Sequence, residues 1–382
     1  MPKNIVVCCD GTGNQVSGDL SNVLKLFRIA QKGRHQRAFY DPGVGTIGND
    51  SPWVRLTQRA RAVFGLATGA GLDDNILAAY RYLIDVYEDG DAVFLFGFSR
   101  GAYTVRALAG FIHMVGLLWP DQANIADYAL TAYKRAAEES NFHIAWDFGR
   151  MTSSRRVPIH FVGVWDTVAS MIVPRPDRMY LPSLRTLPYT RSNPSVRAFR
   201  HAMAIDERRR MFRLNRWTSP QDFVPNPFAQ PPVKQPQDIR QLWFAGVHAD
   251  IGGGYPEAES GLSKFPLIWL INEAVAHGLK IDQTMFDHLA KGIGTKAGAH
   301  NYVAPDCGAA MHRSLRGAWW ILEWLPKRTK WREWRGRRDL FGWYIPRGEP
   351  RLIDAGDSFD PSVDARREAV PSYHPVNIPR RP

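Results

Sequence analysis

The arrangement of apolar residues limits what this chain can fold into more than any other feature of its sequence. Predominantly apolar runs occupy residues 5–9, 38–40, 91–96, 158–165 and 239–247. Segments with helical spacing lie between them, including residues 21–31, 74–88 and 102–115. Runs that are apolar throughout, rather than alternating with polar residues, are typical of strands buried on both faces of a sheet. The pattern therefore predicts an α/β fold with a mostly parallel sheet and helices on both faces.

A glycine-flanked serine lies between one of these strands and the helix that follows it, in the sequence Gly97-Phe98-Ser99-Arg100-Gly101. This matches the G-x-S-x-G pattern, in which a sharp turn exposes the serine and the glycines let strand and helix approach closely. Backbone N–H groups at the start of the helix can support negative charge there. A chance match is the alternative. The strand–turn–helix setting favours a nucleophilic serine in an α/β-hydrolase fold, with part of the chain as a cap.

A serine hydroxyl needs a histidine base and an acid that orients the histidine, and in this fold both follow the serine along the chain. Asp166 and His248 each come directly after a predicted strand. Because the carboxyl ends of parallel strands meet at one edge of the sheet, we predict a catalytic triad of Ser99, Asp166 and His248. Alternatively, Asp166 caps a turn and His248 is a core histidine. Asp250 is the rival acid.

Acyl transfer also requires two N–H donors for the oxyanion. The residue after the nucleophile, Arg100, supplies one, and the loop after the first strand supplies the other, from Gly11 or Thr12. Each such donor is typically worth on the order of 10² to 10³ in rate. Asp10, at the end of the first strand, could serve as an alternative acid, brace this loop by hydrogen bonding, or bind a cation.

We predict a catalytic domain of residues 1–315, in which the proline-rich stretch 174–236 is an insertion or cap. Within that stretch, residues 195–212 have a helix-like sequence. Residues 316–382 form a C-terminal extension, in which Trp and basic residues are interleaved over Trp319–Trp343. Indole rings favour the membrane interface and basic side chains attract anionic lipids, so this region could dock on an anionic membrane. The alternative is a helix with its tryptophans in the core.

Composition indicates which kinds of binding partner the protein is expected to have. Forty-nine Lys and Arg against 37 Asp and Glu give a formal charge of +12, which favours anionic partners such as phospholipid surfaces. No nucleic-acid-binding module is apparent, so we expect no nucleic-acid partner. Three cysteines without a CxxC pair predict neither a disulfide framework nor a zinc site. With no signal peptide and no apolar run long enough to span a membrane, the chain is expected to be cytoplasmic as synthesised.

Several blocks of this sequence together resemble the α/β-hydrolase family known as DUF2235, which includes the catalytic domain of one class of type VI secretion phospholipase effectors. The resemblance is carried by Asp10–Asn14, Asp41–Gly45, Gly97–Tyr103, Gly163–Val168, Asp206–Arg209 and Gly246–Tyr255. It implies a triad at Ser99, Asp166 and His248, and ester hydrolysis with phospholipase A activity as the best-known case. It also implies export by a type VI system, with a secretion partner and a cognate immunity protein.

The leading hypothesis is therefore a serine hydrolase that cleaves carboxylic esters, such as glycerophospholipid acyl esters, through an acyl-enzyme and without a cofactor or metal. One alternative is a metal-dependent phosphoesterase, with Asp10, Asp166, His248 and Asp250 as ligands. Another is a non-catalytic protein that binds a membrane or a partner. Chelator sensitivity and the effect of Ser99→Ala separate these hypotheses.

Overall fold

A seven-stranded sheet runs through the protein, and every neighbouring pair of its strands is parallel. The strand order is β13-β10-β7-β4-β3-β1-β2. The strands are β1 (Asn4–Cys9), β2 (Gln36–Asp41), β3 (Ala92–Phe98), β4 (Ile159–Trp165), β7 (Val196–Ala204), β10 (Asp238–Phe244) and β13 (Ser358–Phe359). The five strands predicted from apolar runs are all present in this sheet.

The structure is a computed structural model, and part of the chain lies outside the residues that it describes. The described residues are 1–11, 20–43, 71–168, 172–174, 182–184, 187–225, 231–294, 301–317, 319–329, 333–334 and 340–379. Of residues 172–174 and 182–184, only the backbone is described.

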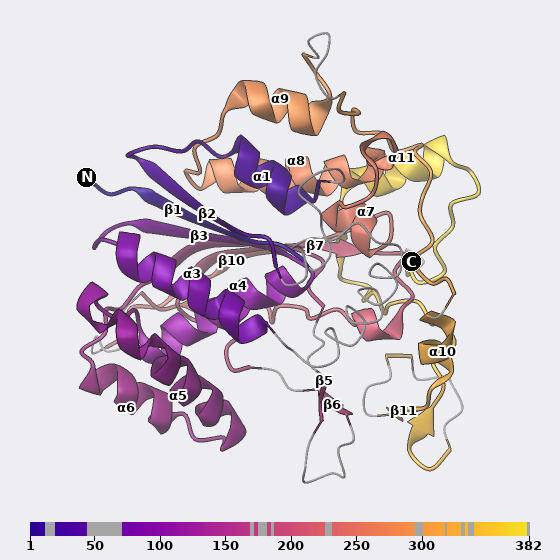
Figure 1. Ribbon diagram of the computed structural model, residues 1–382. Coiled ribbons are helices and arrows are strands. Elements are labelled where there is room, and N and C mark those ends of the chain that lie inside the picture. Colours follow the sequence, from indigo (N-terminus) through magenta and orange to yellow (C-terminus); the bar gives the residue numbers. More distant parts are fainter. Residues whose placement is uncertain are drawn as a thin grey trace, which may run out of the picture.

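Helices cover both faces of the sheet (Figure 1). One layer contains α1 (Asn22–Ile29), α8 (Lys264–Ala276) and α9 (Gln283–Lys291). The other contains α3 (Leu72–Val86), α4 (Arg100–Val115), α5 (Ala126–Glu138) and α6 (His143–Met151). Strand side chains alternate between the two layers: Val6 and Phe94 pack with the first, and Val7 and Leu95 pack with the second. The predicted α/β-hydrolase fold is confirmed.

The segment 195–212, predicted to be helix-like, contains the strand β7 instead. β7 pairs with β4 on one side and β10 on the other, so it lies inside the main sheet and is not part of a cap. The prediction failed because charged side chains interrupt the apolar pattern. Arg200 is buried in this strand, with Nε 2.6 Å from Glu273 Oε2 and Nη2 2.7 Å from Asp238 Oδ2. These carboxylates, which are distant in sequence but adjacent in space, compensate the charge of the buried arginine.

Small elements fill the rest of the predicted insertion and the loops. They are the hairpins β5 (Ile172–Pro174) with β6 (Pro182–Leu184) and β8 (Asp222–Phe223) with β9 (Gln235–Pro236), the helix α7 (His248–Gly252), and the 3₁₀ helices η1 (Pro120–Ile125), η3 (Arg210–Phe212), η4 (Glu257–Glu259) and η5 (Gly261–Ser263).

The C-terminal segment packs against the main body through its final part. It contains α10 (Trp319–Trp324), β11 (Lys327–Arg328), β12 (Trp343–Tyr344), β13 and α11 (Pro361–Ala369). β13 extends the sheet beside β10. Ile353, Val363 and Tyr373 share a hydrophobic cluster with Met203 and Trp243 of the sheet.

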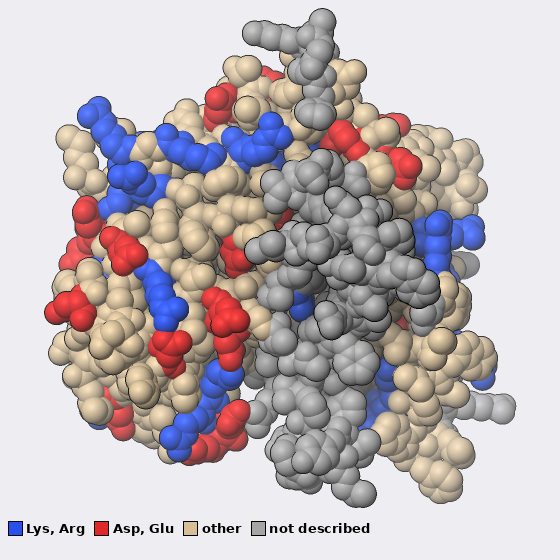
Figure 2. Space-filling model, in the orientation of Figure 1, with Lys and Arg blue, Asp and Glu red and all other residues tan. Residues whose placement is uncertain are grey.

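Charged side chains are mixed on the face of the molecule shown in Figure 2. Lys and Arg are interspersed with Asp and Glu over its described surface, particularly around α3, α5 and α6. On this face the net positive charge is therefore not gathered into a single patch.

Candidate active site

Ser99 lies on a sharp turn between β3 and α4. Its backbone has φ 56° and ψ −118°, a positive φ that non-glycine residues rarely adopt. A Cβ at Gly101 would lie 2.0 Å from the carbonyl oxygen of Cys9, and one at Gly97 would lie 2.4 Å from that of Gly101. The two glycines therefore let α4 start directly against the ends of β1 and β3, as the G-x-S-x-G pattern predicts.

The Ser99 hydroxyl, the His248 imidazole and the Asp166 carboxylate form a continuous hydrogen-bonded chain. Ser99 Oγ is 2.8 Å from His248 Nε2, and His248 Nδ1 is 2.5 Å from Asp166 Oδ2. The three residues follow β3, β10 and β4 at the carboxyl edge of the sheet, where α7 begins (Figure 1). A neutral imidazole with its proton on Nδ1 donates to Asp166 and leaves Nε2 to accept the serine proton.

Asp166 is fully buried, and every contact around it favours the ionised carboxylate. Its backbone has φ 38°, a positive value that non-glycine residues rarely adopt. Oδ1 accepts the N–H of Ala204 at 2.9 Å, and the two oxygens accept Nη1 and Nη2 of Arg351 at 2.5 and 2.9 Å. Burial alone would raise the pKa of this carboxyl, but Arg351 and His248 hold its pKa well below the usual value.

Two aromatic side chains pack against the His248 ring. The ring centroids of Phe98 and Phe212 lie 4.7 and 4.8 Å from that of the imidazole. This burial lowers the pKa of His248, while the hydrogen bond to Asp166 acts in the opposite direction and the net shift is downward. A neutral imidazole, the form that can act as a base, is thereby favoured.

A buried carboxylate beside His248 belongs to Glu207, which was not predicted as a site residue and lies in the block Asp206–Arg209. The N–H of His248 donates to Glu207 Oε2 at 3.2 Å. Arg209 forms two side-chain hydrogen bonds to Glu207, both of 2.9 Å, and Ser314 Oγ donates to its Oε1 at 2.9 Å. Burial raises the pKa of Glu207, but Arg209 reverses this effect and lowers it to about 2. Glu207 thus fixes the backbone that carries His248.

Two of the candidate oxyanion residues, Arg100 and Gly11, lie next to Ser99. Arg100 is the first residue of α4, and a Cβ on Gly11 would lie 3.3 Å from the Cβ of Ser99. The Gly11 N–H, however, donates to Asp10 Oδ1 at 2.7 Å. The Gly11 N–H was predicted as an oxyanion donor. This prediction is corrected, because the N–H is directed at the carboxylate of Asp10. Thr12 lies outside the described residues.

Asp10 and Asp250 both brace loops. Asp10 Oδ2 accepts hydrogen bonds from the hydroxyls of Ser21 and Tyr40, the latter at 2.8 Å. Asp250 Oδ2 accepts the N–H of Val247 at 3.0 Å, and its Oδ1 lies 2.7 Å from His312 Nδ1. His248 Nδ1 contacts Asp166 and neither of these two carboxylates.

The geometry also bears on the metal-dependent hypothesis. Its proposed ligands are engaged separately: Asp10 by hydroxyl and amide donors, Asp250 by His312, and Asp166 by Arg351. In the part of the chain that the structure describes, no group of three or more His, Cys, Asp or Glu side chains could hold a metal ion.

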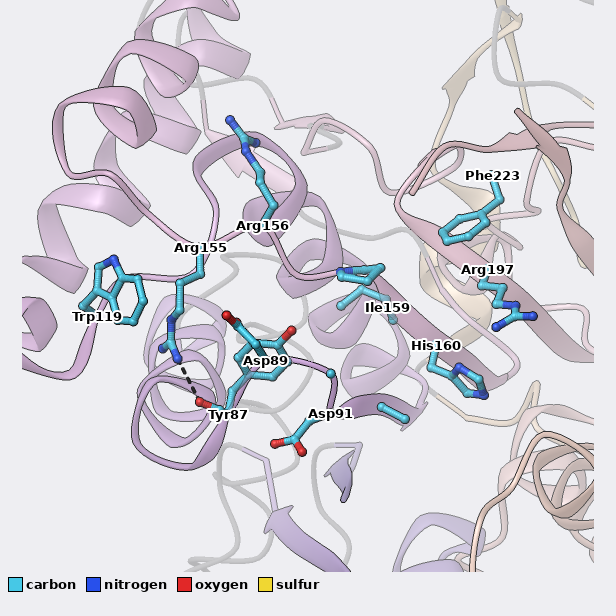
Figure 3. A pocket seen from close by; sticks show the side chains of 13 residues that line it. Tyr87, Asp89, Asp91, Trp119, Arg155, Arg156, Ile159, His160, Arg197 and Phe223 are labelled. Carbon is cyan, nitrogen blue, oxygen red and sulfur yellow. Dashed lines mark hydrogen bonds between the residues drawn. The ribbon is translucent and has the colours of Figure 1, made fainter. Parts of the chain in front are cut away.

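A cavity of about 530 Å³ lies at the opposite, amino-terminal edge of the sheet (Figure 3). Residues at the starts of β3, β4 and β7 line it, including Ala92, Ile159 and Arg197. Arg155 also lines it, and its Nη1 donates to Tyr87 O at 2.8 Å. The lining includes none of the predicted site residues, so this cavity is separate from the Ser99 site.

The parallel sheet, the strained serine and its histidine and aspartate partners define the α/β-hydrolase fold class. Within that class, residues 3–273 match the family model described as T6SS, Phospholipase effector Tle1-like, catalytic domain. The chain belongs to this family, which confirms the DUF2235 resemblance.

Individual relatives resemble parts of the chain. Uncharacterized protein YEL023C of Saccharomyces cerevisiae is 33% identical over 243 residues, which are 59% of this chain and 34% of the yeast protein. An uncharacterized Pseudomonas aeruginosa protein is 19% identical with a TM-score of 0.39, over 74% of this chain and 47% of that one. The Tle1 effector bound to the VgrG spike is 18% identical with a TM-score of 0.36, over 69% and 53%. The chain spans about a third of the yeast protein and about half of the other two.

Proposed function

We propose that the protein is a serine hydrolase that cleaves carboxylic esters, with glycerophospholipid acyl esters as substrates in the manner of a phospholipase A. The observation that carries this proposal is the hydrogen-bonded chain from Ser99 through His248 to Asp166 on a strand–helix elbow. Membership of the Tle1-like phospholipase effector family supports the lipid substrate.

In this mechanism, Ser99 Oγ attacks the ester carbonyl carbon while His248 Nε2 takes its proton. The bond to the alcohol then breaks, the alcohol leaves with that proton, and an acyl-enzyme remains. Water attacks the acyl group, again giving its proton to His248, and the acid leaves as Ser99 regains a proton. Asp166 stays ionised throughout and stabilises the imidazolium, and the amides that begin α4 stabilise the oxyanion.

The test is hydrolysis of short-chain p-nitrophenyl esters and of phospholipid vesicles by the wild type and Ser99→Ala, with and without a chelator. We expect Ser99→Ala to lower the rate by more than about 10⁴-fold, and the chelator to have no effect. Activity that survives Ser99→Ala but is lost with the chelator would contradict the proposal and favour the phosphoesterase. Absence of turnover by the wild type would favour the binding protein.

Ser195 offers a matched control. Its Oγ lies 2.7 Å from His113 Nδ1, so it is a second serine hydrogen-bonded to a histidine. Burial lowers the pKa of His113 to about 4. Ser195→Ala should keep wild-type activity, and a fluorophosphonate probe should label Ser99 and not Ser195.

We also propose that an exposed apolar surface of the C-terminal segment docks on an anionic phospholipid bilayer. We call it the aromatic surface, and it consists of Trp320, Ile321, Trp324, Leu325, Leu340, Phe341 and Trp343. Ile321 is 67% exposed and Phe341 is 93% exposed. Arg347 lies 4.7 Å from the Trp324 ring centroid and Arg328 lies 5.5 Å from that of Trp343, so cations flank the apolar groups. This combination suits an anionic lipid interface.

The same short helix, α10, links the aromatic surface to the active site. Trp319 at its start lies 5.4 Å, centroid to centroid, from Phe212, which packs on His248. Glu323 accepts the N–H of Arg210 at 2.6 Å. A bilayer bound at the outer face of α10 would therefore lie close to the elements that surround Ser99.

Vesicle sedimentation tests the docking. Trp324→Ser combined with Phe341→Ser should abolish binding to vesicles containing phosphatidylglycerol, while hydrolysis of soluble esters is unchanged. Met151→Ser, which removes an exposed apolar side chain from α6, is the control and should bind normally. Wild-type binding should weaken as salt is added, because salt screens the basic groups. Binding by the double variant equal to that of the wild type would exclude this surface.

Family membership also supports export by a type VI secretion system. No helix in the described part of the chain is both long and apolar enough to cross a membrane. The secretion partner is proposed on the family relationship, and the cognate immunity protein stays a prediction.

A further inference from the structure

Arg351 reaches Asp166 from 185 positions further along the chain. Its guanidinium forms two hydrogen bonds to the carboxylate, from Nη1 to Oδ1 at 2.5 Å and from Nη2 to Oδ2 at 2.9 Å. The same nitrogens donate to the carbonyl oxygens of Ala204, at 3.1 Å, and Phe212, at 2.8 Å. A paired contact of this kind fixes the plane of the carboxylate as well as its position.

The two oxygens of Asp166 have different partners apart from Arg351. Oδ1 also accepts the N–H of Ala204, whereas Oδ2 also accepts the hydrogen bond from His248 Nδ1. Because Asp166 has no exposed surface, water cannot replace a lost partner. Rotation of the carboxylate would break the hydrogen bond that orients the imidazole toward Ser99.

We propose that Arg351 is a positioning residue for the reaction at Ser99, which holds the Asp166 carboxylate in the orientation that His248 requires. The C-terminal segment therefore completes the active site. This inference rests on the proposed serine hydrolase function. It concerns a residue outside the span of the family model, which ends at residue 273.

The charges around the Asp166–His248 pair determine the sign of the expected pH effect. Besides Arg351, the pair faces Glu207 and Arg209 from the loop after β7, and His201 from β7 itself. Glu207 is matched by Arg209, so Arg351 is the cation that compensates Asp166. Removing that positive charge raises the pH at which the pair takes up a proton, whichever of the two residues holds it.

The experiment compares the pH dependence of kcat/KM for the wild type, Arg351→Met and Arg351→Lys, with a short-chain p-nitrophenyl ester. Arg351→Met should lower kcat/KM at least about 10-fold and move the acid limb to higher pH by about one pH unit. Arg351→Lys keeps the charge but cannot grip both oxygens, so it should lower kcat/KM while the limb stays near that of the wild type.

Arg366 provides a matched control for a merely structural role. It is also a buried arginine of the C-terminal segment, but its Nη1 donates to the carbonyl oxygens of Cys307 and Ala309. Arg366→Met should leave the acid limb unmoved, and any lost activity should follow the folded fraction measured by circular dichroism. An equal shift in both variants would overturn the proposal.

A readout independent of turnover is the low-field proton resonance expected for His248 Nδ1–H. It should be present in inactive Ser99→Ala and lost or shifted when Arg351→Met is added. If Arg351→Met does not fold, Arg351→Lys decides, and a wild-type rate in that variant would overturn the proposal. If Ser99→Ala is inactive but Arg351→Met is fully active, only this inference is rejected. If Ser99→Ala is active, the proposed function itself is rejected.

Discussion

His248 sets the expected pH dependence at the scale of single residues. Burial against Phe98 and Phe212 lowers its pKa from 6.5, and the contact with Asp166 only partly opposes that shift. The neutral imidazole is the active form, so activity should be present above this pKa and be lost as the pH falls through it. We predict an acid limb of kcat/KM below pH 6.5, measured with a soluble ester. A limb clearly above 6.5 would contradict the assignment of His248 as the base.

The strand–helix elbow is the first element whose packing can be tested. A methyl group on Gly101 would lie 2.0 Å from the carbonyl oxygen of Cys9. Because the backbone fixes the positions of both groups, no side-chain rotation can relieve this clash. We predict that Gly101→Ala destabilises the protein by about 3 kcal/mol or prevents folding. Gly33→Ala is the control, because a Cβ there meets nothing within 4 Å. Thermal unfolding measures both variants, and similar melting temperatures would refute the steric argument.

β7 can be tested through its buried arginine. Arg200→Met should destabilise the protein by about 3 kcal/mol, because it leaves Glu273, which is 15% exposed, without its buried partner. Arg240 forms a 2.9 Å ion pair with the same carboxylate but is 60% exposed, so Arg240→Met should cost less than about 1 kcal/mol. Urea unfolding compares the two. Equal losses would show that burial of the pair does not determine its contribution.

At the scale of the whole molecule, residues before and after position 315 contribute to the same sheet and hydrophobic core. β13 extends the sheet, and Ile353, Val363 and Tyr373 cover Trp243. We predict that the full chain unfolds in a single thermal transition, and that a fragment of residues 1–315 lacks that transition. Ile353→Ala should lower the stability of the full chain by about 2–4 kcal/mol. A fragment that melts like the full chain would instead support the predicted boundary at 315.

How far the sequence predicted the fold and the site depended on how local each signal was. The strands β1 and β3 were readable because burial on both faces demands continuous apolar side chains. Ser99 was readable because the elbow is a steric requirement within five consecutive residues. β7 was misread because Arg200 and His201 look polar until Glu273 and Asp238 are seen beside them. No pattern around Arg351 distinguishes it from other arginines of the chain.

The sequence by itself determined the class of the sheet, the serine elbow, and the order of serine, aspartate and histidine along the chain. Three features were decided only by the tertiary structure. Asp166 rather than Asp250 accepts the hydrogen bond from His248, the Gly11 N–H donates to Asp10, and Arg351 donates to Asp166. The physical reason is that strand burial and elbow sterics act between near neighbours. A buried charge, by contrast, is satisfied by whichever distant side chain the packing brings within hydrogen-bonding reach.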